Sequence, residues 1–481
     1  MLLICLFGLG AYRFYILSAD YMPVFFDEAY YYHWSEQLDF GYYSKPPMVA
    51  WLIALATKTI GVSSFSVKLM SPILYGATAW LVFEIARFLA DQKTALLAAL
   101  IFSSTPLVGF YSLFMTTDVP LYFFWALASF LFLHCRDSSD YKRWSLLGVV
   151  LGLGLLSKYT FIALNLGLVL YLFLSGRRHV FTQVPFWLAV LLCGLVASTN
   201  LYWNVVNDFV SFRHTQDIAK LSESLINPLA LLTFWLSQIA VFGVFWLGVF
   251  VWHWRLIYES SLIRQHILFL SCIIVPLFLL VSVQALLSRA FANWAGPIVI
   301  GASILLAMAC VKLKRKVVMT ALVLQLFLLS IFNHWPQILQ ALDIEQHKKN
   351  SPYTRILGWR ELSQQLHISL NIDSETQLLS DSRKLLAYLG FHARVPVTRL
   401  VYWNPVRENV HNQYDLKNNI ADTYDPALRY LLVLQAPINA EIKQRFRRVS
   451  KEQKISYTYS AMIVRTVYIY QVNGFKGYAN E

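Results

Sequence analysis

Long apolar runs separated by short polar segments fill the first two thirds of the chain, and the last third lacks them. A run of roughly 20 apolar residues is long enough to cross a hydrocarbon core of about 30 Å as a helix. We therefore predict about eleven membrane-spanning helices by this length rule. They are expected at residues 1–17, 64–87, 94–111, 119–135, 145–157, 161–175, 184–202, 228–252, 266–283, 292–310 and 318–333. The first run lacks a basic segment and a small-residue cleavage site, so we interpret it as a retained span.

The tail, residues 334–481, has a different pattern. TQLLSDSRKLLAYLGF, ALRYLLVLQAP and MIVRTVYIYQV contain short β-branched or Leu-rich runs bounded by turn residues, and INAEIKQRFRRVSK is typical of a polar helix. This mixture predicts a small α/β domain. We thus expect a polytopic α-helical membrane protein with a transmembrane domain at 1–333, which includes a first exterior loop at 18–63, and a soluble α/β domain at 334–481.

Composition agrees with this division. Of the 481 residues, 57% are hydrophobic and only 14% are charged, whereas ordinary soluble domains carry about 25% charged residues. The net charge of +13 follows from topology rather than nucleic-acid binding, because Lys and Arg lie mostly between apolar runs or in the tail. The five cysteines lie in or beside apolar runs, so we predict neither a disulfide framework nor a cysteine-based zinc site.

Every second loop between the apolar runs is short and basic. The basic positions are Arg87 and Lys93, then Arg136, Lys142 and Arg143, then Arg177 and Arg178, then Arg255 and Arg264, and finally KLKRK at 312–316. By the positive-inside rule these loops face the cytoplasm. The alternate segments at 18–63, 112–118, 157–159, 203–227 and 284–291 then face the exterior, and so does the tail. The pieces on either side of SKY, residues 157–159, are too short to cross alone, so the count of spans drops by two if they pair.

Ionisable and aromatic side chains gather in the first exterior loop, in FFDEAYYYHWSEQLDFGYYSKPPM at residues 25–48. Asp27 and Glu28 follow directly after a span, where a charge is costly unless it is functional, paired or hydrated. A solvated pair of acids is the alternative. The rings, Tyr30 and Tyr43 among them, fit an aromatic belt at the headgroup level. The KPPMVAWLIAL portion is expected to form an interfacial helix after its two prolines.

A second acid, Asp118 in YSLFMTTDVPLYFFW, lies in a short exterior loop before another helix. Helix capping by Asp118 or Thr117 is the simpler interpretation, and it is compatible with a further role. Two acids on one membrane face, with Lys45 and Lys158 on the same face, indicate a site for an anion and a proton transfer. For Lys158, snorkelling of the side chain is an equally good explanation.

Several motifs in a fixed order resemble the bacterial membrane glycosyltransferases with the GT-C fold. The motifs are DEAYY, YxSKPPM, TTDVPLYFFW, GLGLLSKYTF, LYWNVVNDFVSFRH, RAFANWAGP, LGWREL and NQYD, from about residue 1 to 415. That branch includes lipid A aminoarabinose transferases, lipopolysaccharide galacturonic acid transferases and relatives of protein O-mannosyltransferases. The resemblance implies a polytopic enzyme that uses a polyprenyl-phosphate sugar on the exterior face.

The resemblance also implies roles for individual residues. Asp27 matches the catalytic carboxylate, Lys45 the lysine that contacts the lipid phosphate, and Asp118 the acid that completes the site. The aminoarabinose transferases carry an acidic residue where this chain has Ser44. The resemblance therefore predicts neither a metal at that position nor aminoarabinose as the sugar.

Chemistry adds weaker candidates. Departure of a lipid phosphate needs cationic stabilisation, for which Lys158 and Arg289 are candidates after Lys45. Deprotonation of the acceptor needs a carboxylate, for which Asp27 is chosen, with Glu28 and Asp118 as further catalytic candidates. With one base and direct displacement, the anomeric configuration is expected to invert. The acceptor side or cavity is assigned to His214, Tyr30, Tyr43 and Trp294. No cofactor is required, although Asp27 and Glu28 could bind a divalent cation.

We therefore expect an inverting glycosyltransferase of a bacterial inner membrane, with its active site and tail in the periplasm. The expected partners are a polyprenyl-phosphate sugar, membrane lipids and an acceptor in lipid A, the lipopolysaccharide core or another envelope glycan; we expect a monomer and no nucleic acid. A protein O-glycosyltransferase is one alternative. A lipid or sugar flippase is another, although the spans carry few midplane charges apart from Glu84. A membrane scaffold would leave the acids of the first loop without a purpose.

Overall fold

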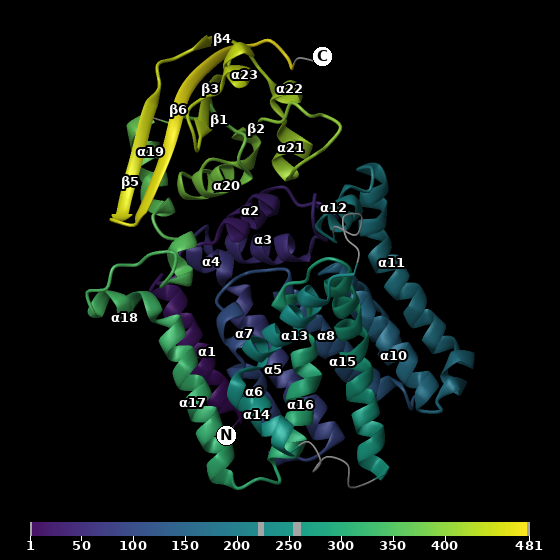
Figure 1. Ribbon diagram of the computed structural model, residues 1–481. Helices are drawn as coiled ribbons and strands as arrows, with labels where there is room; N and C mark the ends of the chain where they lie inside the picture. The colour runs from purple at the N-terminus through teal and green to yellow at the C-terminus, as the bar shows by residue number, and fades with distance from the viewer. Residues whose placement is uncertain (1, 220–225, 254–260, 371, 479–481) are drawn as a thin grey trace. The chain divides into compact units, whose positions relative to one another are not determined.

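The computed structural model describes residues 2–219, 226–253, 261–370 and 372–478 (Figure 1). The chain divides into two compact units. The helical unit comprises Met1–Ala19, Lys45–Val49 and Lys68–Asn333, and the α/β unit comprises Asp20–Ser44, Ala50–Val67 and His334–Glu481. Most of the first loop is therefore grouped with the tail, whereas its segment Lys45–Val49 belongs to the helical unit; the sequence had placed the whole loop in the transmembrane domain.

Each apolar run predicted to span the membrane is helical in the structure. The helices of these runs are α1 (Leu2–Ser18), α5 (Met70–Leu89), α6 (Gln92–Ser104), α7 (Pro106–Tyr111), α8 (Asp118–Cys135), α9 (Tyr141–Leu155), α10 (Ile162–Leu174), α11 (Val184–Val206), α13 (Pro228–Phe242), α14 (Val244–His253), α15 (Ser261–Leu287), α16 (Ile298–Cys310) and α17 (Arg315–Asn333). A further helix, α12 (Val210–Ala219), forms in the segment at 203–227 that was predicted as an exterior loop. Among the described residues, five helices are long and apolar enough to cross a membrane: Ser64–Leu89, Asp118–Cys135, Val184–Val206, Arg264–Leu287 and Arg315–Asn333. The count of about eleven spans stays a prediction.

Two predicted runs are interrupted for local reasons. Thr105 is extended and Pro106 begins a new helix, which divides the run at 94–111 into α6 and α7. Gly243 separates α13 from α14 with φ of 91°, a conformation that residues with a Cβ atom rarely adopt. The turn at SKY is confirmed, because α9 ends at Leu155 and α10 begins at Ile162.

Small residues allow close helix packing in this unit. A Cβ atom at Gly148 of α9 would lie 2.4 Å from the backbone oxygen of Ala189 in α11. One at Gly167 of α10 would lie 2.0 Å from the backbone oxygen of Cys272 in α15. Helices in a bilayer gain stability mainly from such close contact. These glycines therefore bring α9 against α11 and α10 against α15.

The α/β unit contains a six-stranded sheet. Its strands are β1 (Thr376–Ser380), β2 (Leu400–Tyr402), β3 (Arg429–Leu434), β4 (Phe446–Val449), β5 (Gln453–Ser460) and β6 (Ile463–Phe475). The order is β2-β1-β3-β6-β4, and β5 also pairs with β6. β1 is parallel to β2 and β3, whereas β6 is antiparallel to β3, β4 and β5. The predicted small α/β domain is thus confirmed.

The α/β unit also contains nine α-helices among its described residues. They are α2 (Phe26–Glu36), α3 (Met48–Ile60), α4 (Ser64–Lys68), α18 (Trp335–Ala341), α19 (Trp359–Leu370), α20 (Arg383–His392), α21 (Gln413–Asn418), α22 (Ile420–Thr423) and α23 (Ala440–Gln444), of which α3 begins and α4 ends at the boundary with the helical unit. The helix expected after the two prolines is confirmed as α3. The helix predicted at INAEIKQRFRRVSK is wrong beyond α23, because Phe446–Val449 pairs with β6 as strand β4 and buries Phe446 in the core.

The rings of the first loop pack inside the α/β unit. Trp34 stacks on Tyr42 with ring centres 4.6 Å apart, and Tyr30 lies edge-on to Trp34 at 4.9 Å. All three are at most 1% exposed. The aromatic-belt interpretation is therefore wrong for these three rings, because a belt residue presents its ring to the headgroup region.

Candidate active site

A buried cluster around Asp118 joins three distant parts of the helical unit. Lys158 Nζ lies 2.6 Å from Asp118 Oδ1, and Asn293 Nδ2 donates to Asp118 Oδ2 at 3.0 Å. The side chains of Lys158 and Asp118 are only 14% and 6% exposed. Both carboxylate oxygens are thus engaged by polar groups, as a buried charge requires. Lys158 is paired rather than snorkelling.

Local structure explains how these residues meet. Asp118 is the first residue of α8, and the preceding Thr117 makes no side-chain cap bond. Lys158 is extended in the turn between α9 and α10. Asn293 belongs to a 3₁₀ turn, Ala292–Ala295, that Gln238 of α13 holds by donating to the Ala292 carbonyl at 3.3 Å. The three residues of the cluster therefore lie at a helix start or in the turns between helices.

Two further cations come from segments that adjoin this cluster. The backbone N–H of Met48 donates to the carbonyl of Leu156 at 3.1 Å, which fixes the segment of Lys45 beside the turn that carries Lys158. Lys45 is partly exposed. Arg289 is exposed and lies four residues before Asn293. The helical unit thus brings Asp118 and Lys158 into direct contact and places Lys45 and Arg289 on neighbouring segments.

Three tyrosines near Asp118 were missed by the sequence analysis. Tyr75 of α5, Tyr111 of α7 and Tyr122 of α8 are close enough to interact electrostatically with its carboxylate. The rings of Tyr75 and Tyr122 are 5.4 Å apart. Only Tyr122 gave a signal, since it lies one helical turn after Asp118 in DVPLY. Three tyrosines therefore belong to the electrostatic surroundings of the carboxylate, in addition to the cation that contacts it.

The turn that carries Lys158 is tethered by a polar network. Tyr159 OH donates to Asn200 Oδ1 at 3.1 Å, and Asn204 Nδ2 donates to Tyr159 OH at 3.3 Å. These contacts attach the turn to α11. Among the weaker candidates, His214 lies half-buried on α12 and Trp294 follows Asn293 in the same turn.

In the α/β unit, the two neighbouring acids Asp27 and Glu28 have different surroundings. Glu28 is 1% exposed, and its Oε2 accepts the backbone N–H of Phe25 at 2.9 Å, which caps the N-terminus of α2. The Asp27 side chain is 34% exposed and lies 3.4 Å from Arg383 Nη2. Of the two acids, Asp27 is the one with an accessible carboxylate, and Glu28 has a structural role.

Tyr30 and Tyr43 also make contacts within the α/β unit. The backbone N–H of Gln413 donates to Tyr30 OH at 2.5 Å, and Tyr43 N–H donates to Gln413 Oε1 at 2.7 Å. Both tyrosines are buried. These contacts give the two residues a packing role, and their assignment to an acceptor cavity stays a prediction.

Two histidines of the α/β unit are buried and uncharged at neutral pH. Burial lowers the pKa of His33 to about 3. It does the same for the pKa of His392, which burial and the nearby Arg360 and Arg394 lower to about 3. The Nε2 atoms of both rings are buried without a hydrogen-bond partner in the described part of the chain. Protonation would therefore place an uncompensated charge in the interior.

We expect acid to destabilise this unit. Below the unfolded histidine pKa of about 6.5, the unfolded chain binds protons that the native state rejects, so the free energy of unfolding falls from pH 7 towards pH 3. Burial raises the pKa of Glu36. The native state therefore binds the proton of Glu36 more readily than the unfolded chain does, which slightly increases the free energy of unfolding on acidification between the unfolded pKa of about 4.3 and the raised native pKa. Denaturant unfolding of wild type and His33→Gln at pH 7.5 and 5.5 tests this, and the variant should lose less stability on acidification. His367→Gln, at an exposed position of α19, should match wild type; equal slopes for all three proteins would contradict the account.

The described residues offer no ready metal centre. Among residues 2–219, 226–253, 261–370 and 372–478, no group of three or more His, Cys, Asp or Glu side chains is placed to hold a metal ion. The structure therefore assigns no ligands to a divalent cation.

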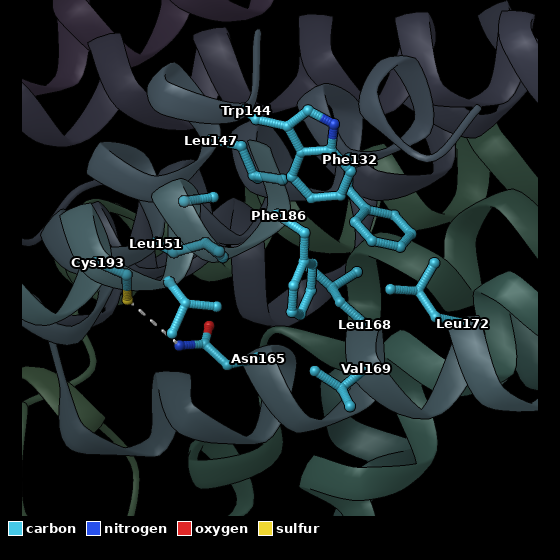
Figure 2. Close-up of a pocket in the computed structure, with 12 residues that line it drawn as sticks. Phe132, Trp144, Leu147, Leu151, Asn165, Leu168, Val169, Leu172, Phe186 and Cys193 are labelled. Carbon is cyan, nitrogen blue, oxygen red and sulfur yellow. Dashed lines mark hydrogen bonds between the residues drawn. The ribbon is translucent and has the colours of Figure 1, made fainter. Parts of the chain in front are cut away.

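An apolar pocket of about 190 Å³ lies between α8, α9, α10 and α11 of the helical unit (Figure 2). Its lining includes Phe132, Trp144 and Phe186, and no charged side chain is among the residues that form it. Asn165 contributes one polar contact, from Nδ2 to Cys193 Sγ at 3.9 Å. Phe132 follows Asp118 by 14 positions on α8, which is about 21 Å at 1.5 Å per residue. The pocket is thus separate from the polar cluster.

Comparison with solved structures identifies the fold. The chain superimposes on ArnT from Cupriavidus metallidurans bound to undecaprenyl phosphate with a TM-score of 0.68 and 13% identity, over 97% of each chain. The apo form of the same protein gives 0.66 and 14%. The chain therefore has the GT-C fold of polytopic membrane glycosyltransferases, as the sequence motifs predicted.

Sequence comparison identifies particular relatives. Residues 44–203 match the family model described as dolichyl-phosphate-mannose-protein mannosyltransferase. The chain is 32% identical over 296 residues to lipid A galacturonosyltransferase RgtD from Rhizobium johnstonii, and this alignment covers 61% of the chain and 62% of RgtD. It is 32% identical over 123 residues to undecaprenyl phosphate-alpha-4-amino-4-deoxy-L-arabinose arabinosyl transferase from Pseudomonas aeruginosa, which covers 24% of the chain and 22% of that relative. The predicted resemblance to bacterial lipid A glycosyltransferases is thus confirmed.

Proposed function

We propose that this protein transfers a sugar from a polyprenyl-phosphate carrier to lipid A or the lipopolysaccharide core at the periplasmic face of the inner membrane. The observation that carries the proposal is the buried Asp118–Lys158–Asn293 cluster, in a chain with the GT-C fold and 32% identity to a lipid A galacturonosyltransferase. A cation that is buried, paired and adjoined by two further cationic segments suits a departing lipid phosphate.

The residues divide between two chemical tasks. In the helical unit, Lys45, Lys158 and Arg289 stabilise the negative charge of the departing phosphate, and Asp118 holds Lys158 in place. In the α/β unit, Asp27 accepts the proton of the acceptor hydroxyl. The acceptor oxygen forms a bond to the anomeric carbon while the bond from that carbon to the phosphate oxygen breaks. The electron pair of that bond leaves with the phosphate.

Direct displacement predicts inversion of the anomeric configuration. The test is transfer by the full-length protein in lipid vesicles, from a synthetic polyprenyl-phosphate sugar of known configuration to lipid A, followed by NMR of the product. The product should carry the opposite anomeric configuration to the donor. Retention would contradict a mechanism with one base and no covalent intermediate.

A second candidate function has one observation in its favour. Residues 44–203 match a model described as a protein mannosyltransferase, so a protein hydroxyl is the alternative acceptor. The same vesicles supplied with an unfolded Ser- and Thr-rich peptide in place of lipid A distinguish the two. Transfer to the peptide alone would favour protein O-glycosylation.

A further inference from the structure

Helix α2, which carries Asp27, has a polar residue at every third position. Asp27, Tyr30, His33 and Glu36 follow one another at this spacing in FDEAYYYHWSE. At 3.6 residues per turn, each step of three residues turns by about 60° around the helix axis, so the four side chains follow a band that winds about halfway round the helix from Asp27 to Glu36. All four bond to the part of the α/β unit formed by residues 334–481, and we call them the polar stripe of α2.

The two ends of the polar stripe are bound by different elements. At the N-terminal end, Asp27 Oδ1 lies 3.4 Å from Arg383 Nη2, at the first residue of α20. At the C-terminal end, Glu36 Oε2 accepts the backbone N–H of Val397 at 2.9 Å. Because α2 is held at both ends, it resists tilting and sliding; a single contact would leave it free to pivot.

The middle of the stripe is bound by the start of α21. Gln413 N–H donates to Tyr30 OH at 2.5 Å, and Tyr414 OH lies 2.6 Å from His33 Nδ1. The side chain of Asn412 caps α21 by accepting the N–H groups of Tyr414 and Asp415. The NQYD motif is therefore a rigid docking element for α2.

Helix α20 lies directly against α2, as the ribbon also indicates (Figure 1). A Cβ atom at Gly390 would lie 2.8 Å from His33 Nε2 and 2.6 Å from a Leu400 methyl group. Arg383 is held by two rings of α2, with its guanidinium 5.3 Å from the centre of Phe26 and 4.9 Å from that of Tyr30. The guanidinium thus has a fixed place beside the Asp27 carboxylate.

We propose that Arg383 and Tyr414 are positioning residues for Asp27, so that residues 334–481 help to build the active site. This inference rests on the proposed function of Asp27 as the base. Arg383 fixes the carboxylate from one side, and Tyr414 fixes the helix at His33, about 1.7 turns further on. A base displaced by about 1 Å loses up to about 100-fold in rate, even when the substitution is remote from the reacting atoms.

The test compares arginine variants of the full-length protein in vesicles with a polyprenyl-phosphate sugar and lipid A. Arg383→Gln should lower kcat about 10- to 100-fold with little change in the donor KM, because the phosphate is bound by lysines of the helical unit. Arg383→Lys should recover part of kcat, since it restores the charge without the planar fork. The matched control is Arg394→Gln, because Arg394 also belongs to the α/β unit but donates to the Val62 carbonyl at 2.8 Å rather than to α2.

A second variant keeps the inference testable if Arg383→Gln does not fold. Tyr414→Phe removes the hydroxyl that meets His33 and keeps the ring contact with Tyr30, whose centre is 5.2 Å away. Its kcat should fall in the same direction, again without a change in donor KM.

The outcomes separate the inference from the proposed function. Wild-type kcat in Arg383→Gln and Tyr414→Phe, with Asp27→Asn inactive, would overturn the positioning role and leave the function standing. Equal losses in Arg383→Gln and Arg394→Gln would also overturn it, because they would indicate general destabilisation. No transfer by the wild-type protein from any polyprenyl-phosphate sugar would count against the function itself. A fall in kcat confined to the two positions that contact α2 supports the inference.

Discussion

Asp27→Asn should lower kcat for sugar transfer by about 10²- to 10⁴-fold, the range for loss of a general base. An amide of the same shape cannot accept the acceptor's proton. Stability should change by less than about 1 kcal/mol, because the Asp27–Arg383 pair is long and about one third exposed. Steady-state kinetics of the purified protein in vesicles, together with its unfolding midpoint, measure both quantities.

Asp39→Asn provides a matched control for this experiment. Asp39 lies in the same loop, its side chain is also 34% exposed, and it is 3.9 Å from Lys417 Nζ. The structure gives it no part in the reaction, so the variant should keep the wild-type kcat. Similar activity in Asp27→Asn and wild type would contradict the role of Asp27 as base, and equal losses in both variants would point to disturbance of the loop.

Lys158→Met should cost both stability and activity. The substitution leaves the carboxylate of Asp118 buried without its cation, and breaking a buried pair in this way costs about 3–5 kcal/mol. The double variant Lys158→Met/Asp118→Asn carries no unpaired charge, so its stability should recover while transfer remains absent. Denaturant unfolding in detergent and transfer assays on the same preparations measure the two effects.

A control variant and two possible results test the role of the Lys158–Asp118 pair. Lys142→Met changes an exposed lysine in the first turn of α9 and should affect neither quantity. A double variant as unstable as Lys158→Met would mean that the ion pair is not the source of the loss. Full transfer by Lys158→Met would remove this lysine from the phosphate site.

The helices of the helical unit were predictable because the bilayer imposes one dominant rule. A hydrocarbon core needs about 20 apolar residues in a helix, and each such run is helical in the structure. The breaks at Pro106 and Gly243 were harder to predict. Proline and glycine are also tolerated inside unbroken membrane helices, so neither residue by itself marks a break. β4 was missed because FRRV at 446–449 carries two central arginines and lies next to a polar helix pattern, and it forms a strand by pairing with β6.

Part of the candidate site also followed from the sequence. Alternation of basic loops predicted that Asp118 and Lys158 share one face, and the structure places them in direct contact. The tyrosines around Asp118 gave almost no signal, because tyrosine is common in apolar runs. Sequence distance also hid the polar stripe of α2, since its partners lie more than 350 residues away.

Glu28 illustrates the limit of reasoning from residue type. Asp27 and Glu28 are adjacent acids after one span, and the sequence predicted Asp27 as the base with Glu28 as a further catalytic candidate. The helix start at Phe26 gives the two acids different surroundings, because Glu28 accepts the N–H of Phe25 and Asp27 remains partly exposed. This difference depends on the position of a helix terminus, which sequence patterns give only to within a few residues.

The most direct test of the proposed function is mass spectrometry of lipid A and core oligosaccharide from cells with the wild-type protein, without it, and with Asp27→Asn. We expect a mass increment of one sugar only in cells with the wild-type protein, which would identify the sugar and the acceptor together. Identical spectra from the three strains would contradict transfer to lipopolysaccharide.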